Sequence, residues 1–116
     1  MTANLPQLID AYDPNAPLDR AFTIPSSWYT NKDLYNLELK TVFSNSWQYA
    51  ARKDQLEAAG QFITTDIAGE PLVVVRGNDG VLRAFFNVCR HHAAVVMTEP
   101  EGTVPQLRCP YHGWTY

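Results

Sequence analysis

The chain has few cysteines, no long apolar run and no run of basic residues, and each of these absences argues against a class of protein. It contains two cysteines in 116 residues, too few for the disulfide framework of a small secreted domain. No segment approaches the ~20 apolar residues of a membrane-spanning helix. The net charge is −3 and no lysine or arginine run occurs, which argues against nucleic acid as a partner. Residues 1–10 lack both the positive segment and the apolar core of a secretory signal.

What the chain does contain is a concentrated set of metal-ligating residues. Cys89-Arg90-His91 and Cys109-Pro110-Tyr111-His112 use both cysteines and two of the three histidines, and 17 residues (92–108) separate the two motifs. A single zinc site more often has a Cys-x-x-Cys pair and a later pair of histidines. One thiolate and one imidazole from each of two loops instead suit a two-iron cluster, with thiolates on one iron and imidazoles on the other.

These motifs resemble the signature of Rieske [2Fe–2S] proteins, which is Cys-x-His, about seventeen residues, and then Cys-x-x-His. The flanking segments Phe86-Asn87-Val88 and Gly113-Trp114-Thr115-Tyr116 are similar to the N-terminal domain of Rieske non-haem iron oxygenases of the aromatic-ring-hydroxylating type. The resemblance covers roughly residues 28–116, and the run Cys-Arg-His-His-Ala leans toward the choline-monooxygenase-like branch.

The resemblance implies a ligand set for the cluster. Cys89 and Cys109 would bind one iron as thiolates, and His91 and His112 would bind the other iron as neutral imidazoles. Neutral ligands raise the reduction potential above that of all-cysteine clusters, to about −150 to +300 mV. With both cysteines used as ligands, no disulfide remains, and we expect a soluble protein in the reducing cytoplasm.

Departures from related proteins bear on this site. Respiratory-chain Rieske proteins carry two further cysteines and a serine, and the corresponding residues here are Ala94, Tyr111 and Trp114. Only Tyr116 remains as a hydroxyl donor to the cluster, so we expect a potential at the low end of the range. Tyr111 and Trp114 are then predicted to shield the cluster from water.

The first loop also departs from the family. The family usually has Arg-Gly after the first histidine, whereas this chain has His92-Ala93. Alanine lacks the conformational freedom of glycine, so the local turn can differ. The motif gives His92 no ligand role, and we predict a loop or interface residue.

The predicted fold class is mainly β, a Rieske-type antiparallel β-sandwich that is incomplete at its C-terminal end. Residues 1–27, with four of the eight prolines, are predicted to form an extended arm. Residues 28–46 form a helical lead-in with one helix near 31–44, capped by Thr30. Its core-facing stripe is predicted to be Tyr35, Leu39, Val42 and Phe43.

Residues 47–116 are predicted to form the Rieske domain itself. Strands are expected over 61–68, 72–76 and 81–88, and the last two are joined by a Gly-Asn-Asp-Gly hairpin turn at residues 77–80. Residues 97–105 are expected to be a loop, and Leu107-Arg108 a short strand that leads to Cys109.

Only one histidine, His92, is left once the cluster is built. A mononuclear iron site needs two histidines and a carboxylate, so we expect this catalytic site, with its Fe(II), in a domain absent from this chain. The chain would be the N-terminal part of a longer oxygenase that inserts oxygen from O₂ into an organic substrate. A flavin reductase or ferredoxin would supply electrons, and the whole protein would be a homo-oligomer.

Two other functions remain open from the sequence. The first is a stand-alone Rieske ferredoxin, which carries electrons and is not an enzyme. The second is a Cys₂His₂ zinc module that mediates interactions. The substrate of an oxygenase cannot be derived from this chain, because its contacts belong to the catalytic domain.

Overall fold

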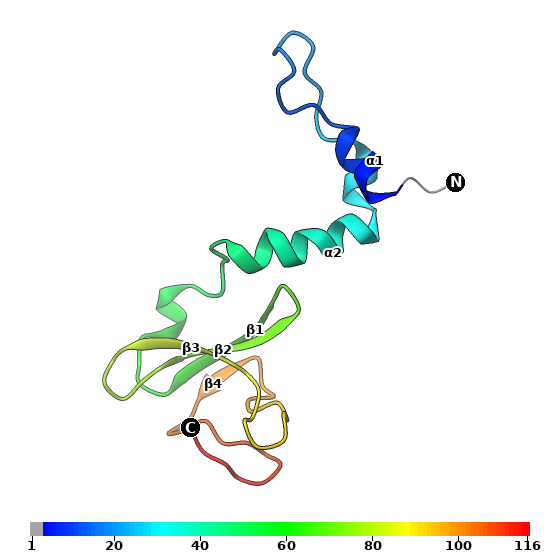
Figure 1. Ribbon diagram of the computed structural model, residues 1–116. Helices are drawn as coiled ribbons and strands as arrows, with labels where there is room; N and C mark the ends of the chain where they lie inside the picture. The colour runs from blue at the N-terminus through cyan, green and yellow to red at the C-terminus, as the bar shows by residue number, and fades with distance from the viewer. Residues whose placement is uncertain (1–3) are drawn as a thin grey trace. The chain divides into compact units, whose positions relative to one another are not determined.

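A computed structural model describes residues 4–116 (Figure 1). The chain divides into two compact units, and the boundary falls between Ser46 and Trp47. The first unit is helical, and the second contains all the strands of the described chain. Within residues 4–116, no helix has the length and apolar character needed to cross a membrane.

The first unit contains a helix that the sequence analysis did not predict. Helix α1, Leu5–Asp10, lies in the segment expected to be an extended arm. The Asn4 side chain accepts the Gln7 N–H at 3.1 Å, and the Gln7 side chain accepts the Asn4 N–H at 3.1 Å. This capping box satisfies two N–H groups that the helix leaves free, and Pro6 is tolerated because the first turn needs no donor there. The prediction of an extended arm is therefore wrong for residues 5–10, and residues 1–3 of the predicted arm lie outside the described residues.

Long-range contacts join this arm to the segment that follows it. The Trp28 indole N–H, in the 3₁₀ turn η1 (Ser26–Tyr29), donates a 2.7 Å hydrogen bond to the Leu8 carbonyl. The rings of Tyr12 and Trp28 meet edge to face with centroids 5.6 Å apart. The segment thus has its own tertiary contacts around Leu8, which is buried.

Helix α2, Lys32–Thr41, confirms the predicted helix, with a 3₁₀ turn η2 (Phe43–Asn45) after it. Its cap is Asn31 and not Thr30, because the Asn31 side chain accepts the N–H groups of Asp33 and Leu34, each at 3.0 Å. The predicted stripe of buried residues is wrong. Leu34 is the buried residue of this helix, whereas Tyr35 is 53% exposed.

The second unit is built on one antiparallel sheet in the order β3-β2-β1-β4. After the 3₁₀ turn η3 (Lys53–Leu56), its strands are β1 (Gln61–Ile67), β2 (Glu70–Arg76), β3 (Leu82–Phe86) and β4 (Glu101–Thr103). Three of them confirm predicted strands, and the mainly β fold class is confirmed. Strand β4 lies inside the predicted loop 97–105 and pairs with β1. The predicted strand Leu107-Arg108 is reduced to a single bridge between Arg108 and Thr115.

The turn between β2 and β3 is formed by the glycines at its two ends. Gly77 donates to the Val81 carbonyl at 2.9 Å, and Gly80 donates to Gly77 at 2.9 Å with a φ of +75°. The predicted hairpin between β2 and β3 is therefore confirmed, and the first ligand motif begins three residues after β3 ends.

The core lies between this sheet and the two loops that carry the cysteines. Its buried cluster consists of Phe62, Val73, Cys89, Val96, Leu107 and Cys109. The sequence pattern of alternating strand residues places Phe62 and Val73 on the inner face, where they are 2% and 1% exposed. Both thiols are thus part of the core and pack against its apolar side chains.

A buried polar residue fixes the exit from β3. The Asn87 side chain accepts the Met97 N–H and donates to the Met97 carbonyl, both at 2.8 Å. Its own N–H donates to the Pro71 carbonyl at 2.7 Å. Because Asn87 is only 3% exposed, losing these bonds would leave buried polar groups without partners. This residue ties the two ends of the first loop to the sheet.

Candidate metal centre

The site consists of two loops that meet at one end of the sheet (Figure 1). In the first loop, the Cys89 N–H donates to the Ala94 carbonyl at 2.7 Å, and the Ala93 N–H donates to the Cys89 carbonyl at 2.9 Å. A bridge between Val88 and Val95 closes the base. The loop is thereby a tight backbone turn that begins at a buried cysteine.

The second loop repeats this pattern. The Cys109 N–H donates to the Trp114 carbonyl at 2.7 Å, the Gly113 N–H donates to the Cys109 carbonyl at 3.0 Å, and the Arg108–Thr115 bridge closes the base. Each position in the first loop therefore has a counterpart twenty residues later in the second.

The counterpart of Gly113 is Ala93, and both have left-handed backbone, with φ of +75° and +56°. A turn that differs from the family's was expected at Ala93, and in the structure this turn has the same left-handed conformation as the one at Gly113. An alanine in this conformation costs about 1–2 kcal/mol. The loop keeps its shape in spite of that cost.

The two thiols lie at the buried base of the site. Cys89 and Cys109 are 3% and 1% exposed, and both are free cysteines. The Tyr116 hydroxyl lies 3.2 Å from the Cys89 sulfur and accepts the Arg90 N–H at 3.1 Å. The hydrogen bond from Tyr116 lowers the pKa of Cys89, and the backbone N–H groups of His91 and His92 add to this effect. A thiol whose anion is stabilised in this way is prepared to bind a metal.

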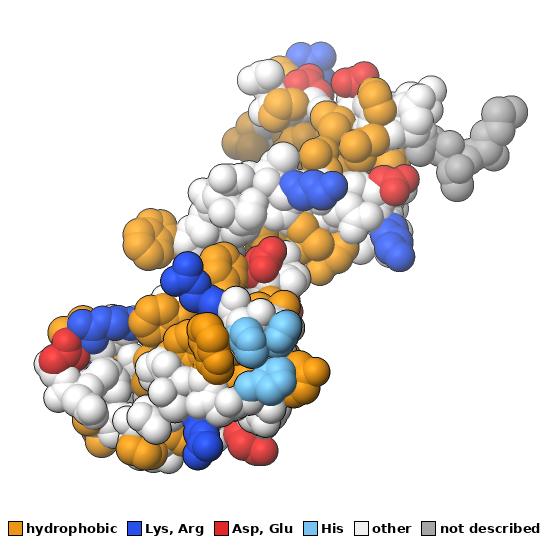
Figure 2. Space-filling view, turned by 60° about the horizontal axis from the view of Figure 1, so that its bottom comes forward, with side chains coloured by type: hydrophobic (Ala, Val, Ile, Leu, Met, Phe, Trp, Pro, Cys, Tyr) orange, Lys and Arg blue, Asp and Glu red, His pale blue; other side chains and the backbone are white. Residues whose placement is uncertain are grey.

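The imidazoles lie on the outer side of the site. His91, His92 and His112 are all exposed, and one nitrogen from each falls in a group whose members lie within 4.8 Å of one another. Figure 2 shows histidine side chains gathered on the surface beside hydrophobic ones. Neither cysteine sulfur belongs to this group of converging atoms in the described chain. The structure thus places the two predicted thiolate ligands in the buried cluster and the two predicted imidazole ligands in an exposed group.

His92 is the residue of this group that the sequence analysis left out. Its ring lies 3.9 Å from that of His91 and 5.3 Å from that of His112, measured between centroids. The backbone of His92 lies in a loop, as predicted. The signal that could have placed it with the ligands is its loop position, three residues after Cys89, which matches that of His112 after Cys109.

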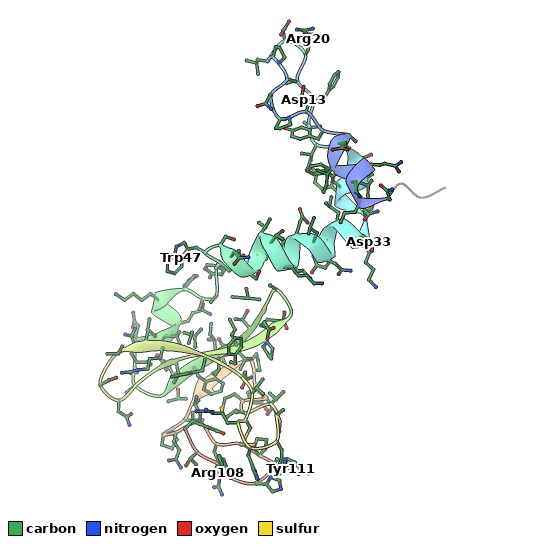
Figure 3. All side chains as sticks on the ribbon, viewed as in Figure 1. Asp13, Arg20, Asp33, Trp47, Arg108 and Tyr111 are labelled. Atoms are coloured by element: carbon green, nitrogen blue, oxygen red, sulfur yellow. The ribbon has the colours of Figure 1, made fainter. Side chains whose placement is uncertain are left out.

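Two aromatic side chains flank the imidazoles. The Trp114 ring stacks on His91 with centroids 4.7 Å apart and an interplanar angle of 5°, and the Tyr111 ring lies 3.9 Å from His112. Trp114 is 48% exposed and Tyr111 is 64% exposed, so they line the imidazoles and leave the outer face open to solvent. Figure 3 shows Tyr111 at the outer end of its loop.

An apolar cavity of about 590 Å³ lies in the same unit. Its lining includes Val73, Phe85, Leu107 and Tyr116, but none of the three histidines. No aspartate, glutamate, histidine or lysine is among its lining residues, and Tyr116, the one lining side chain of a kind that acts as a general base, also belongs to the cysteine site. The chemistry of this unit therefore centres on the two loops.

The donor set fits an iron–sulfur cluster with two kinds of ligand. Two buried thiols and a separate outer group of imidazoles do not converge on one point, as the ligands of a single tetrahedral zinc would. An inner metal with thiolate ligands and an outer metal with imidazole ligands accounts for both layers.

The family of the chain follows from this fold and site together with its similarity to known proteins. Residues 46–116, more than half of the chain, match the model of the Rieske [2Fe-2S] domain. The chain belongs to the Rieske [2Fe–2S] domain family, whose cofactor is the [2Fe–2S] cluster.

Its relatives are Rieske oxygenases. It is 40% identical to the chloroplastic choline monooxygenase of Arabidopsis thaliana over 98% of this chain and 27% of that protein. Its fold matches the quaternary ammonium Rieske monooxygenase CntA, with a TM-score of 0.76 and 36% identity over 83% of this chain and 27% of that one. Naphthalene 1,2-dioxygenase matches with a TM-score of 0.70 and 33% identity over 76% of this chain and 20% of that one. The chain spans about a quarter of the length of the curated relatives it matches.

Proposed function

We propose that Cys89 and Cys109 hold the inner iron of a [2Fe–2S] cluster, and that His91 and His112 hold the outer iron. The observation that carries this assignment is the two-layer arrangement, with thiols 3% and 1% exposed beneath a group of exposed imidazole nitrogens. The Tyr116 hydroxyl, 3.2 Å from Cys89, favours the thiolate at the inner position.

When bound, this group supplies one-electron transfer. The residues of the chain decide where the electron can leave. Apolar core side chains cover the thiols, whereas His91 and His112 face solvent between Trp114 and Tyr111. A docking partner would therefore make its contact at the imidazole side of the loops.

The larger protein is proposed to be a Rieske non-haem iron oxygenase that inserts oxygen from O₂ into an organic substrate. Its mononuclear Fe(II) would be held by two histidines and a carboxylate outside residues 1–116. A flavin reductase or ferredoxin would donate electrons. A homo-oligomer is proposed because the structure of a similar protein, a quaternary ammonium Rieske monooxygenase, gives insights into electron transfer between its subunits. No membrane or nucleic-acid partner is proposed.

The substrate class proposed for the larger protein is a quaternary ammonium compound. Two of the similar proteins carry such substrates in their names, a choline monooxygenase and the quaternary ammonium Rieske monooxygenase CntA. An aromatic hydrocarbon is the alternative, represented by naphthalene 1,2-dioxygenase. Oxygen consumption by the whole enzyme with choline or carnitine, but not with naphthalene, supports the first class, and the reverse selectivity contradicts it.

Sequencing the gene beyond codon 116 tests the oxygenase proposal. A continuing reading frame that encodes two histidines and a carboxylate in one further domain supports it. A stop codon within a few dozen residues instead favours the stand-alone ferredoxin. A zinc module is separated from both by metal analysis, because zinc brings no acid-labile sulfide.

A cytoplasmic location is kept as a prediction for this protein. The alternative is the chloroplast, where the similar choline monooxygenases of plants are located.

A further inference from the structure

The first loop carries two imidazoles, and the proposed cluster needs only one of them. His91 and His92 follow one another, and the nitrogens of both lie within 4.8 Å of that of His112. All three side chains are exposed, and the His92 ring lies 3.9 Å from that of His91 between centroids, so the loss of the His91 side chain leaves room for His92 to turn toward the outer iron. These three are the chain's only histidines.

The backbone of the two loops points to His92 on independent grounds. His92 and His112 each stand three residues after a buried cysteine and directly before a residue with positive φ, Ala93 or Gly113. In both loops the N–H of that residue donates to the carbonyl of the cysteine. His92 is therefore the counterpart of the ligand His112, whereas the counterpart of His91 is Tyr111.

We infer that His92 is a reserve ligand of the outer iron. It binds in place of His91 when that imidazole detaches or is removed, and His91 remains the ligand in the intact chain. This inference rests on the proposed ligand assignment. The second loop has no such reserve, because Tyr111 takes the place that a second imidazole would need. The two histidine ligands are thus unequal: His91 can be replaced and His112 cannot.

Four variants of the full chain test the inference after anaerobic cluster reconstitution: His91→Ala, His92→Ala, the double variant and His112→Ala. Iron, acid-labile sulfide, the visible spectrum and the reduced-state EPR spectrum are measured. We expect His92→Ala to match the wild type and His91→Ala to retain most of its iron and sulfide with a shifted EPR spectrum. The double variant and His112→Ala should lose the cluster.

Pulsed EPR on the His91→Ala variant counts the coordinated imidazoles. Two histidine nitrogens coupled to the reduced cluster support replacement by His92, and one nitrogen overturns it. Equal cluster loss in His91→Ala and the double variant also overturns the inference. If the wild-type chain itself takes up no cluster, the proposed ligand assignment fails first, and the two failures are therefore distinguishable.

A second measurement does not depend on the folding of the His91 variant. A reserve ligand recaptures the outer iron when His91 detaches, so it slows the loss of cluster to a chelator. We expect EDTA to remove the cluster several-fold faster from His92→Ala than from the wild type. Arg90→Ala, which removes an exposed side chain of the same loop, is the matched control and should lose the cluster at the wild-type rate. Equal rates in His92→Ala and the wild type contradict the inference.

Discussion

Replacing Tyr116 by phenylalanine should lower the reduction potential of the cluster. The change removes one hydroxyl that lies 3.2 Å from the Cys89 sulfur and leaves the ring in place. Reduction adds one negative charge to the cluster, so a donor beside a ligand sulfur stabilises the reduced state more than the oxidised state. Without this donor, the reduced state becomes less favourable.

The magnitude follows from the strength of such a bond. A hydrogen bond to a charged group contributes about 1.5–3 kcal/mol. If about 1 kcal/mol of this is gained only on reduction, the potential falls by about 40 mV, because 59 mV corresponds to a tenfold change for one electron. The Arg90 N–H also loses its acceptor, but Arg90 is exposed and water can replace it.

The assay is a redox titration of the reconstituted chain, followed by visible absorption and EPR. Tyr111→Phe is the matched control, because it removes an exposed hydroxyl from the same site. We expect no shift in this control. An unchanged potential in Tyr116→Phe, or an equal shift in both variants, would refute the reasoning. The wild-type potential itself should lie in the lower part of the Rieske range, and a midpoint clearly above zero contradicts that expectation.

Three further predictions concern stability. Ala93→Gly should raise the free energy of unfolding by about 0.5 kcal/mol, since relief of the left-handed alanine exceeds the entropy cost of glycine; a lower melting temperature contradicts this. Val73→Ala should cost about 2 kcal/mol, because Val73 is 1% exposed in the core, and an unchanged melting temperature would count against it. The Arg83 guanidinium holds the pKa of Asp79 well below its ordinary value, so this ion pair stabilises the fold above about pH 4 and is lost as the pH falls. Asp79→Asn should therefore reduce the fall in melting temperature between about pH 5 and pH 3, and the same fall as in the wild type refutes this.

The proposed metal ligands stand out in the sequence because their signal is local. Cys89, His91, Cys109 and His112 stand in two short motifs, and the hairpin before the first motif has strong turn residues. The structure brings these four residues to one site. The backbone conformation of Ala93 could not be predicted from the residue type. The surrounding hydrogen bonds impose a left-handed turn that alanine tolerates at a cost.

Other features depend on contacts that no local pattern reveals. Strand β4 is three exposed residues whose conformation is set by pairing with β1, so its sequence looks like a loop. Helix α1 could have been predicted from Asn4, Pro6 and Gln7, which are typical of a helix start, but the density of prolines concealed it. The spacing of His92 after Cys89 matches that of His112 after Cys109, but the equal hydrogen bonding and turn geometry of the two loops, which give this match its meaning, are visible only in the three-dimensional structure.

The measurement that tests the central claim most directly is the metal and sulfide content of the reconstituted chain and its Cys109→Ser variant. Cys109 is 1% exposed and is proposed to bind the inner iron. The account predicts two irons and two acid-labile sulfides in each wild-type chain, with an EPR signal on reduction, and loss of both in the variant. Stoichiometric zinc without sulfide in the native protein, or a cluster that survives Cys109→Ser unchanged, would contradict it.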